Sequence, residues 1–192
     1  LGLSAGYFTL DRWAITTGAS AGRFTMTQTA DGPSGIGKCL KMACTTADTS
    51  IAASETLGIR QKIEGQNVQH FAKGTADATT IGVSFWAKQN ESRVIAVSLY
   101  DNTGNRWVSR LVTVGTSWAR HTITFPADTT GVPVNSNALG FQIFFYLHAG
   151  SNYTSGTLAS TWEGYTAANV CPGIGSFYAS TSNTFFLTGV QM

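Results

Sequence analysis

The stretch that decides the fold of this chain reads Ile59-Arg60-Gln61-Lys62-Ile63-Glu64-Gly65-Gln66-Asn67-Val68. It is followed by Val83-Ser84-Phe85-Trp86-Ala87 and echoed at the end by Phe186-Leu187-Thr188-Gly189-Val190-Gln191-Met192. Residues of alternating polarity send their side chains to opposite faces of a strand, so one face is buried and the other is solvated. We therefore predict strands at Gly58–Ile63, Thr79–Lys88 and Thr184–Met192.

The same alternation extends over the rest of the chain. It predicts further strands at Asp11–Thr16, Arg23–Gln28, Lys38–Thr45, Arg93–Tyr100, Arg106–Val114, Trp118–Phe125 and Leu139–His148. Turn residues separate them, as at 31–35 and 101–105, and Asn67–Phe71 has the spacing of one helical turn. About nine or ten short strands at this spacing predict an all-β, two-sheet antiparallel β-sandwich. The pattern alone leaves a jelly roll and an immunoglobulin-like strand order open.

The strand predicted at Leu139–His148 is apolar on both faces. One face carries Phe141, Ile143, Phe145 and Leu147, and the other carries Phe144, Tyr146 and His148. Such a strand is either covered on both sides or presents aromatic rings for binding. The segment Ala149–Asn183 has few strand signals but is too hydrophobic for disorder. We expect it to fold over the Phe144 and Tyr146 face as a lid.

Composition excludes several functional classes. Only 11% of the 192 residues are charged, against roughly a quarter in an average domain. Gly, Ser and Thr carry the polarity, as is common in extracellular and particle-borne β proteins; alternatively, partner chains cover part of the surface. The net charge is +2 and no Lys/Arg run is present, so no nucleic-acid partner is expected. No apolar run approaches the roughly 18 residues of a membrane span.

The three cysteines are expected to be free thiols. Cys39 and Cys44 would face opposite sides of one strand and could not pair with each other. Cys171 lies in a loop, and a bridge from it to one of the other two stays open at the sequence level. No Cys-x-x-Cys pair or His cluster predicts zinc.

No motif predicts catalysis. Residues 32–39 nearly match a phosphate-binding loop, but Cys39 stands where the hydroxyl ligand of magnesium belongs and a strand follows instead of a helix. The carboxylates are spread thinly, whereas a glycosidase needs two facing a cleft. Asp101 and Asp128 fall in predicted turns, where Asp caps backbone amides. We predict no enzyme activity and no cofactor; a loop calcium site, the one alternative considered, would draw on Asp11, Asp31 and Asp48.

Carbohydrate binding needs aromatic rings for the C–H faces of sugars and planar polar groups for their hydroxyls. The candidate stacking platforms are Trp107, Tyr146 and Trp162. The candidate hydrogen-bonding partners are Arg110, Gln142, His148 and Asn105. The remaining tryptophans within strand patterns, Trp13, Trp86 and Trp118, are expected to fill the core.

Several motifs taken in order resemble the jelly-roll domain of bacteriophage tail, tail-fibre and virion appendage proteins, which is similar to a carbohydrate-binding module. They are Tyr7-Phe8-Thr9-Leu10-Asp11-Arg12-Trp13, Asp31-Gly32-Pro33, Leu40-Lys41, Thr46-Ala47-Asp48, Arg60-Gln61-Lys62-Ile63-Glu64-Gly65, Ser84-Phe85-Trp86-Ala87-Lys88, Gly150-Ser151-Asn152 and Thr188-Gly189-Val190-Gln191. The resemblance favours the jelly roll. No charged or Pro-rich linker divides the chain, so we expect a single domain over residues 1–192, as part of a longer virion protein. The family is defined by its scaffold, so no functional residue carries over.

The resemblance implies a virion component that meets the host surface or other virion proteins. The first hypothesis is a non-catalytic module that binds host-surface glycan during host attachment. The alternative is a structural domain that mediates protein–protein assembly or decorates the capsid or tail. Phage fibres are often trimers, which makes a homo-oligomer an expectation from the family, although nothing in the sequence sets a symmetry. A polysaccharide hydrolase would need paired carboxylates in a cleft.

Overall fold

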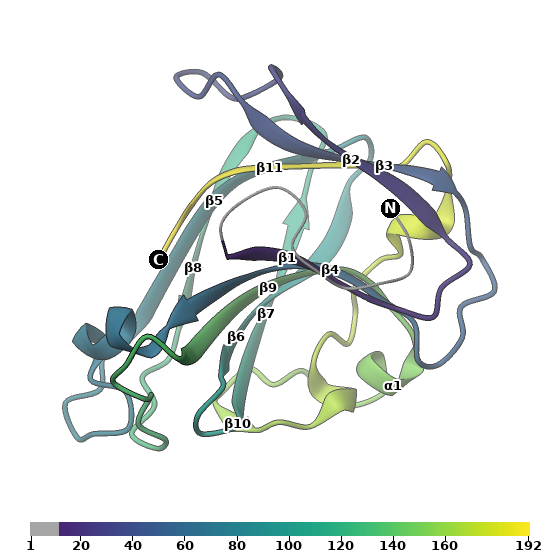
Figure 1. Ribbon diagram of the computed structural model, residues 1–192. Coiled ribbons are helices and arrows are strands. Elements are labelled where there is room, and N and C mark those ends of the chain that lie inside the picture. Colours follow the sequence, from purple (N-terminus) through teal and green to yellow (C-terminus); the bar gives the residue numbers. More distant parts are fainter. Residues whose placement is uncertain (1–11) are drawn as a thin grey trace.

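The computed structural model describes residues 12–192, which form two antiparallel β-sheets packed face to face (Figure 1). Sheet A has the strand order β1-β4-β9-β6-β7-β10. Its strands are β1 (Trp13–Gly18), β4 (Thr56–Glu64), β9 (Leu139–Ala149), β6 (Arg93–Asp101), β7 (Arg106–Val114) and β10 (Glu163–Gly164). Sheet B has the order β2-β3-β11-β5-β8. Its strands are β2 (Arg23–Thr29), β3 (Cys39–Thr46), β11 (Thr184–Gln191), β5 (Ile81–Gln89) and β8 (Ala119–Phe125).

The core lies between the sheets and is built from the apolar faces that the sequence predicts. Ile81, Val83 and Phe85 of β5 are buried from sheet B, and Phe141, Ile143 and Phe145 of β9 are buried from sheet A. Phe85 and Phe145 meet edge to face across the sandwich, with ring centroids 5.1 Å apart. This offset geometry is the favoured one for aromatic pairs, so the two central strands fix how the sheets pack.

The segment 149–183 covers the outer face of sheet A (Figure 1). It contains the short helix α1 (Ser151–Thr154), the strand β10, and the 3₁₀ turns η2 (Ala167–Asn169) and η3 (Phe177–Ala179). Its Ala159, Val170 and Cys171 form a second buried cluster with Phe144 and Tyr146 of β9. The predicted cover over this face is confirmed, and it makes β9 buried on both sides.

Backbone hydrogen bonds tie the cover to the sheet along its whole length. The Ser109 amide donates to the Ala159 carbonyl at 2.7 Å, and the Gly175 amide donates to the Val94 carbonyl at 2.9 Å. The Ser109 hydroxyl also donates to the Val170 carbonyl at 2.7 Å. These bonds pair polar groups that burial would otherwise leave unsatisfied, so the segment is an integral third layer of the fold.

The predicted fold class, an all-β two-sheet jelly roll, is confirmed. Every predicted strand is present with ends shifted by at most a few residues, and the predicted helical turn is η1 (Gly65–Phe71). The pattern missed β10, which is two residues long and pairs with the edge of β7. The start of the first predicted strand at Asp11 lies outside the described residues. Among those residues, no helix is both long and apolar enough to cross a membrane.

Candidate functional site

The proposed stacking platforms lie under the cover or inside the sandwich. Trp107 and Tyr146 belong to the second buried cluster, with 2% and 7% of their surface exposed, and Trp162 joins the main core with 8% exposed. The indole of Trp162 is fixed by its donation to the Pro126 carbonyl at 2.8 Å. As folded, these rings present no open face for a sugar, so their role in binding stays a prediction that requires the cover to open.

Arg110 and His148 are held by contacts within the protein. The Arg110 guanidinium donates to the carbonyls of Ser109 and Ser160 and lies over the Phe125 ring. His148 is fully buried between Glu55, 3.0 Å from its Nε2, and Ser176, 2.9 Å from its Nδ1.

The His148 contacts connect β9, the loop before β4 and the cover. Burial lowers the pKa of His148, and the hydrogen bond and charge of Glu55 oppose that shift. The order Ser-His-Glu resembles the logic of a hydrolase triad. However, the imidazole is sealed from solvent, and the Ser176 hydroxyl also accepts a bond from the Tyr178 amide. The arrangement ties three segments together.

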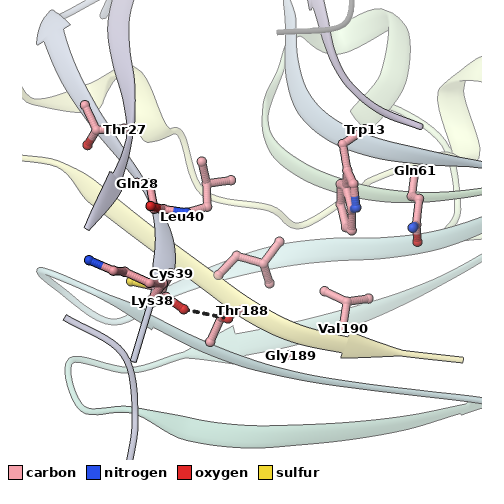
Figure 2. A pocket seen from close by; sticks show the side chains of 11 residues that line it. Trp13, Thr27, Gln28, Lys38, Cys39, Leu40, Gln61, Thr188, Gly189 and Val190 are labelled. Atoms are coloured by element: carbon pink, nitrogen blue, oxygen red, sulfur yellow. Dashed lines mark hydrogen bonds between the residues drawn. The ribbon is translucent and has the colours of Figure 1, made fainter. Parts of the chain in front are cut away.

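An opening between the two sheets forms a pocket of about 540 Å³ near the start of β1 (Figure 2). Trp13 and Gln61 reach into it from sheet A, and Leu40 and Val190 face them from sheet B. The complete lining is Trp13, Thr27, Gln28, Lys38, Cys39, Leu40, Gln61, Leu187, Thr188, Gly189 and Val190. The volume falls within the range of small-molecule sites.

The Trp13 ring is a wall of this pocket. One side of the ring lies against Phe145, with centroids 6.3 Å apart and planes 27° from parallel, which holds the indole in place. The ring is half-buried, which corrects the expectation that Trp13 fills the core. The carboxamides of Gln28 and Gln61 make no hydrogen bond within the described part of the chain. One fixed indole and two unpaired carboxamides therefore share one pocket.

A second polar group lies on the outer face of sheet A beside the cover. The register aligns Lys62, Gln142, Tyr100 and Trp107 in one row across four strands, and Gln142 and Trp107 are buried in it. Here Gln142 donates to the Asn102 amide oxygen at 2.9 Å, and Tyr100 donates to that of Asn105 at 2.8 Å. We call the group Arg60, Tyr100, Asn102, Asn105, Gln142, Phe144 and Tyr165 the amide strip. It contains two of the predicted hydrogen-bonding residues, Gln142 and Asn105.

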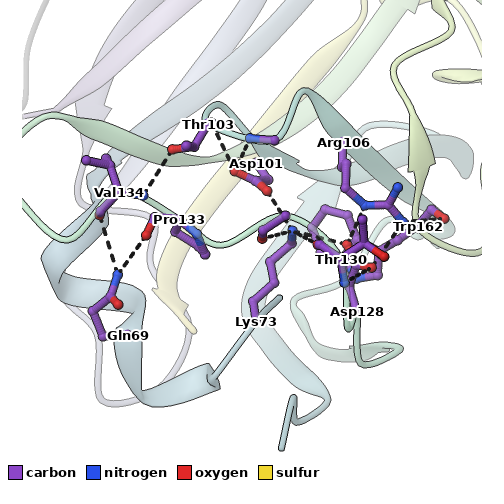
Figure 3. Close-up of polar contacts among 12 residues, drawn as sticks. Gln69, Lys73, Asp101, Thr103, Arg106, Asp128, Thr130, Pro133, Val134 and Trp162 are labelled. Atoms are coloured by element: carbon purple, nitrogen blue, oxygen red, sulfur yellow. Dashed lines mark hydrogen bonds and ion pairs between the residues drawn. The ribbon is translucent and has the colours of Figure 1, made fainter. Parts of the chain in front are cut away.

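A buried ionic network supports the β6–β7 hairpin and Trp162 from below (Figure 3). The Lys73 ammonium lies 2.6 Å from Asp101 Oδ2 and 3.1 Å from Asp128 Oδ2. It also donates to the carbonyls of Thr130 and Gly131, both at 2.9 Å. Lys73 lies 4.9 Å from the centre of the Trp162 ring.

Asp128 is also held by Arg106, which binds its two oxygens at 2.6 and 3.0 Å. Burial raises the pKa of Asp128, but the hydrogen bonds of Arg106 and Lys73 outweigh it and lower the pKa below its usual value. Asp101 and Asp128 are thus neutralised inside the protein and do not face a cleft as a glycosidase pair would. Their predicted turn roles are confirmed, since Asp101 accepts from two amides of its turn and Asp128 accepts from the Thr130 amide.

The structure also shows the state of the three cysteines and of the acids considered for a calcium site. Cys39, Cys44 and Cys171 are free and buried, so the bridge left open for Cys171 is not formed. Asp48 accepts from the Ser20 hydroxyl and Ala21 amide, and Asp31 pairs with Lys88. Asp11 lies outside the described residues, among which no group of three metal-ligating side chains occurs.

No protein-family model and no curated protein sequence matches the chain. Among solved structures it is similar to a CBM4 structure at 16% identity and a TM-score of 0.49, with 93% of this chain and 84% of the other covered. It is also similar to the family 11 carbohydrate-binding module from Clostridium thermocellum in complex with a β-1,3-1,4-mixed-linked tetrasaccharide. The identity is 10% and the TM-score 0.46, with 95% of this chain and 88% of the other covered. A third similar structure is the enzymatically active domain of bacteriophage CBA120 tailspike protein 4, at 12% identity and a TM-score of 0.48, with 94% of this chain and 19% of the other covered. Likenesses this distant carry no argument about the site.

Proposed function

We propose that this protein is a non-catalytic glycan-binding module and that the inter-sheet pocket takes one sugar ring. The observation that carries the proposal is the fixed Trp13 indole in one pocket with the two unpaired carboxamides of Gln28 and Gln61. An indole face packs against the C–H groups of a sugar, and a carboxamide both donates to and accepts from its hydroxyls. This combination matches a neutral sugar better than a wholly apolar ligand.

The lining also explains why binding without hydrolysis is proposed. None of the residues that line the pocket carries a carboxylate, and glycoside hydrolysis ordinarily needs two. Leu40, Leu187 and Val190 supply an apolar floor, which favours enclosure of one ring over a long chain lying across the opening.

The test is a glycan array that includes lipopolysaccharide and capsular polysaccharide, probed with the wild-type chain and with Gln28→Ala and Gln61→Ala. Each lost hydrogen bond costs about 0.5–1.5 kcal/mol, so each variant should bind roughly 2- to 10-fold more weakly. Trp86→Ala is the matched control, because that half-buried tryptophan lies on the outer face of sheet B. A folded chain that binds no glycan, or binding that ignores both glutamines, would refute the proposal.

We further propose that the module works in a virion, on a tail, tail fibre or appendage, with a host-surface glycan and other virion proteins as partners. The support is the ordered set of motifs that resembles phage appendage domains, together with a chain in which only 11% of residues are charged. The alternative role is assembly through protein contacts alone. Labelled antibody against the chain, imaged on particles, tests the location. Host adsorption by particles that carry Gln61→Ala separates attachment from assembly, because an assembly role predicts normal adsorption.

A further inference from the structure

Arg60 lies on the amide strip and makes no salt bridge with any residue that the structure describes. It extends from β4 on the outer face of sheet A, next to Phe144 in the register. Its guanidinium carbon lies 5.8 Å from the centre of the Phe144 ring, within the range of a cation–π contact. That contact orients the guanidinium over the sheet.

The donors of this guanidinium are largely unused. Among the described residues, no acceptor bonds the buried Nε atom, and Nη1 has only a long contact of 3.4 Å to Gln142 Oε1. No carboxylate forms a salt bridge with Arg60 in that part of the chain. A guanidinium presents its N–H groups as a rigid fork that fits the two oxygens of a carboxylate. Because Nε is sealed from solvent, the Nη groups are the donors that a planar anion would use.

The acids nearest in the register are already occupied. Glu64 pairs with Arg12 and accepts from Gln66, and Glu163 accepts from Asn169 at 2.8 Å. Lys62 extends from the same face two residues beyond Arg60 but has an interaction of its own, so Arg60 is the cation considered for an anionic ligand.

The rest of the amide strip fits the body of a sugar. Tyr165 is 39% exposed and packs against Tyr100 of β6, with ring centroids 5.9 Å apart, so the strip carries aromatic surface two strands away from Arg60. Burial raises the pKa of both Tyr100 and Tyr165, so both phenols stay neutral hydroxyl groups at physiological pH. The Asn102 and Asn105 amides are exposed at the same edge.

We infer that the amide strip binds an acidic sugar, a uronic or sialic acid unit, with its carboxylate held by Arg60. Residues 60 and 61 are neighbours on β4 whose side chains point to opposite faces of sheet A. The strip is therefore a separate site from the inter-sheet pocket, and neither depends on the other. The ring carboxylate is the chemical feature that the strip recognises, and the tyrosines and amides contact the ring and its hydroxyls.

Paired probes that differ only in the charged group test this assignment. We would titrate the whole chain by calorimetry with tetragalacturonate and its methyl ester, and with sialyllactose and its methyl ester, at 150 mM salt, where screening removes long-range attraction. At least one acid should bind roughly 10-fold or more tightly than its neutral match. Arg60→Gln should weaken that acid by roughly 10- to 100-fold, the size of a charged hydrogen-bond contribution.

Arg120→Gln is the control, because Arg120 is an exposed arginine on the outer face of sheet B that bonds Ser84 and Gln191. Thermal melting confirms that each variant is folded. Equal binding of each acid and its neutral match, or an Arg120→Gln effect as large as that of Arg60→Gln, would overturn the inference. If neutral glycan still binds and that binding depends on Gln61, the proposed function of the inter-sheet pocket stands even when the acidic-sugar site fails. If acid binding is unaffected by Gln61→Ala, the two sites are separate.

Discussion

Replacing Lys73 by Met should destabilise the fold far more than a typical lysine substitution. The side chains of Lys73 and Asp101 are 3% and 0% exposed, so the ion pair is sealed from water. Met keeps the apolar stem of the side chain and removes only the ammonium. The Asp101 Oδ2 atom then loses its bond of 2.6 Å, and the carbonyls of Thr130 and Gly131 lose their donor.

The expected magnitude follows from which charges stay compensated. Asp128 keeps both bonds from Arg106, so the penalty falls mainly on Asp101, whose other oxygen accepts from the amides of Thr103 and Gly104. Removing one partner of a buried pair typically costs about 3–5 kcal/mol. In a chain of this size about 1 kcal/mol shifts the melting temperature by about 2–4 °C. Lys73→Met should therefore lower the melting temperature by roughly 6–20 °C.

The assay is thermal and urea unfolding of the wild type, Lys73→Met and Lys73→Met with Asp101→Asn. The double variant removes the uncompensated charge, so it should recover part of the loss, which is the signature of direct coupling. Lys88→Met is the matched control. Its ammonium makes a contact of similar length, 2.7 Å, but its partner Asp31 is 49% exposed, and solvent screens such a pair. If Lys73→Met is no worse than Lys88→Met, the reasoning about the buried network is wrong.

Three further predictions concern pH, thiol chemistry and packing. Because burial lowers the pKa of His148, the unfolded chain binds that proton at a higher pH. Stability should then be full above about pH 6.5 and fall as the pH drops below it; His148→Gln should flatten that part of a melting-temperature curve. Burial raises the pKa of Cys171 to about 12, so iodoacetamide at pH 8 should label it only in the unfolded chain, as peptide mass spectrometry would show. A Cβ added at Gly140 would lie 2.4 Å from the Gly65 Cα, whereas a Cβ added at Gly82 would have no atom within 4 Å. Gly140→Ala should cost about 1–3 kcal/mol or more in urea unfolding, and Gly82→Ala almost nothing.

The sequence predicts the layers of this fold well because the strands obey a local rule. Each central strand alternates over its own length, so the buried side of β5 and the two buried sides of β9 follow from residues that are adjacent in the chain. The cover over β9 was also predictable, since two apolar faces need two partners and Ala149–Asn183 was the one long apolar segment left unassigned.

The state of individual tryptophans was not predictable in this way. Trp107 lies on the outer face of β7 and would be exposed there, but the distant residues Val170 and Cys171 cover that face. Trp86 and Trp118 lie in strand patterns yet are half-buried, on the outer side of sheet B or at its edge. The buried role of Lys73 was likewise not predictable from the sequence, because its partners Asp101 and Asp128 lie in two turns that are distant in sequence and meet only in the folded chain.

The two pocket glutamines could have been found in the sequence from their positions on the strands, although they belong to no motif. Gln61 alternates in phase with Ile59 and Ile63 on the inward face of β4, and Gln28 is in phase with Phe24 on that of β2. Burying an unpaired carboxamide is costly, so a glutamine at an inward position indicates either a partner or a water-filled opening. Both residues line the same opening, so a polar residue that interrupts an apolar strand face indicated the proposed pocket, whereas Trp107, Tyr146 and Trp162 are buried.

The two proposed sites share one structural cause. Because side chains alternate along β4, the sequence Arg60-Gln61 sends a cation to the outer face of sheet A and a carboxamide to the space between the sheets. Neither side chain has an ionic partner or strong hydrogen bond among the described residues. A strand at the centre of a sandwich has no such freedom, since both of its faces are buried. Here β4 lies next to the edge strand β1, near the start of which the sandwich opens. This position lets adjacent residues serve two surfaces, so a ligand at one should leave affinity at the other unchanged unless β4 itself moves.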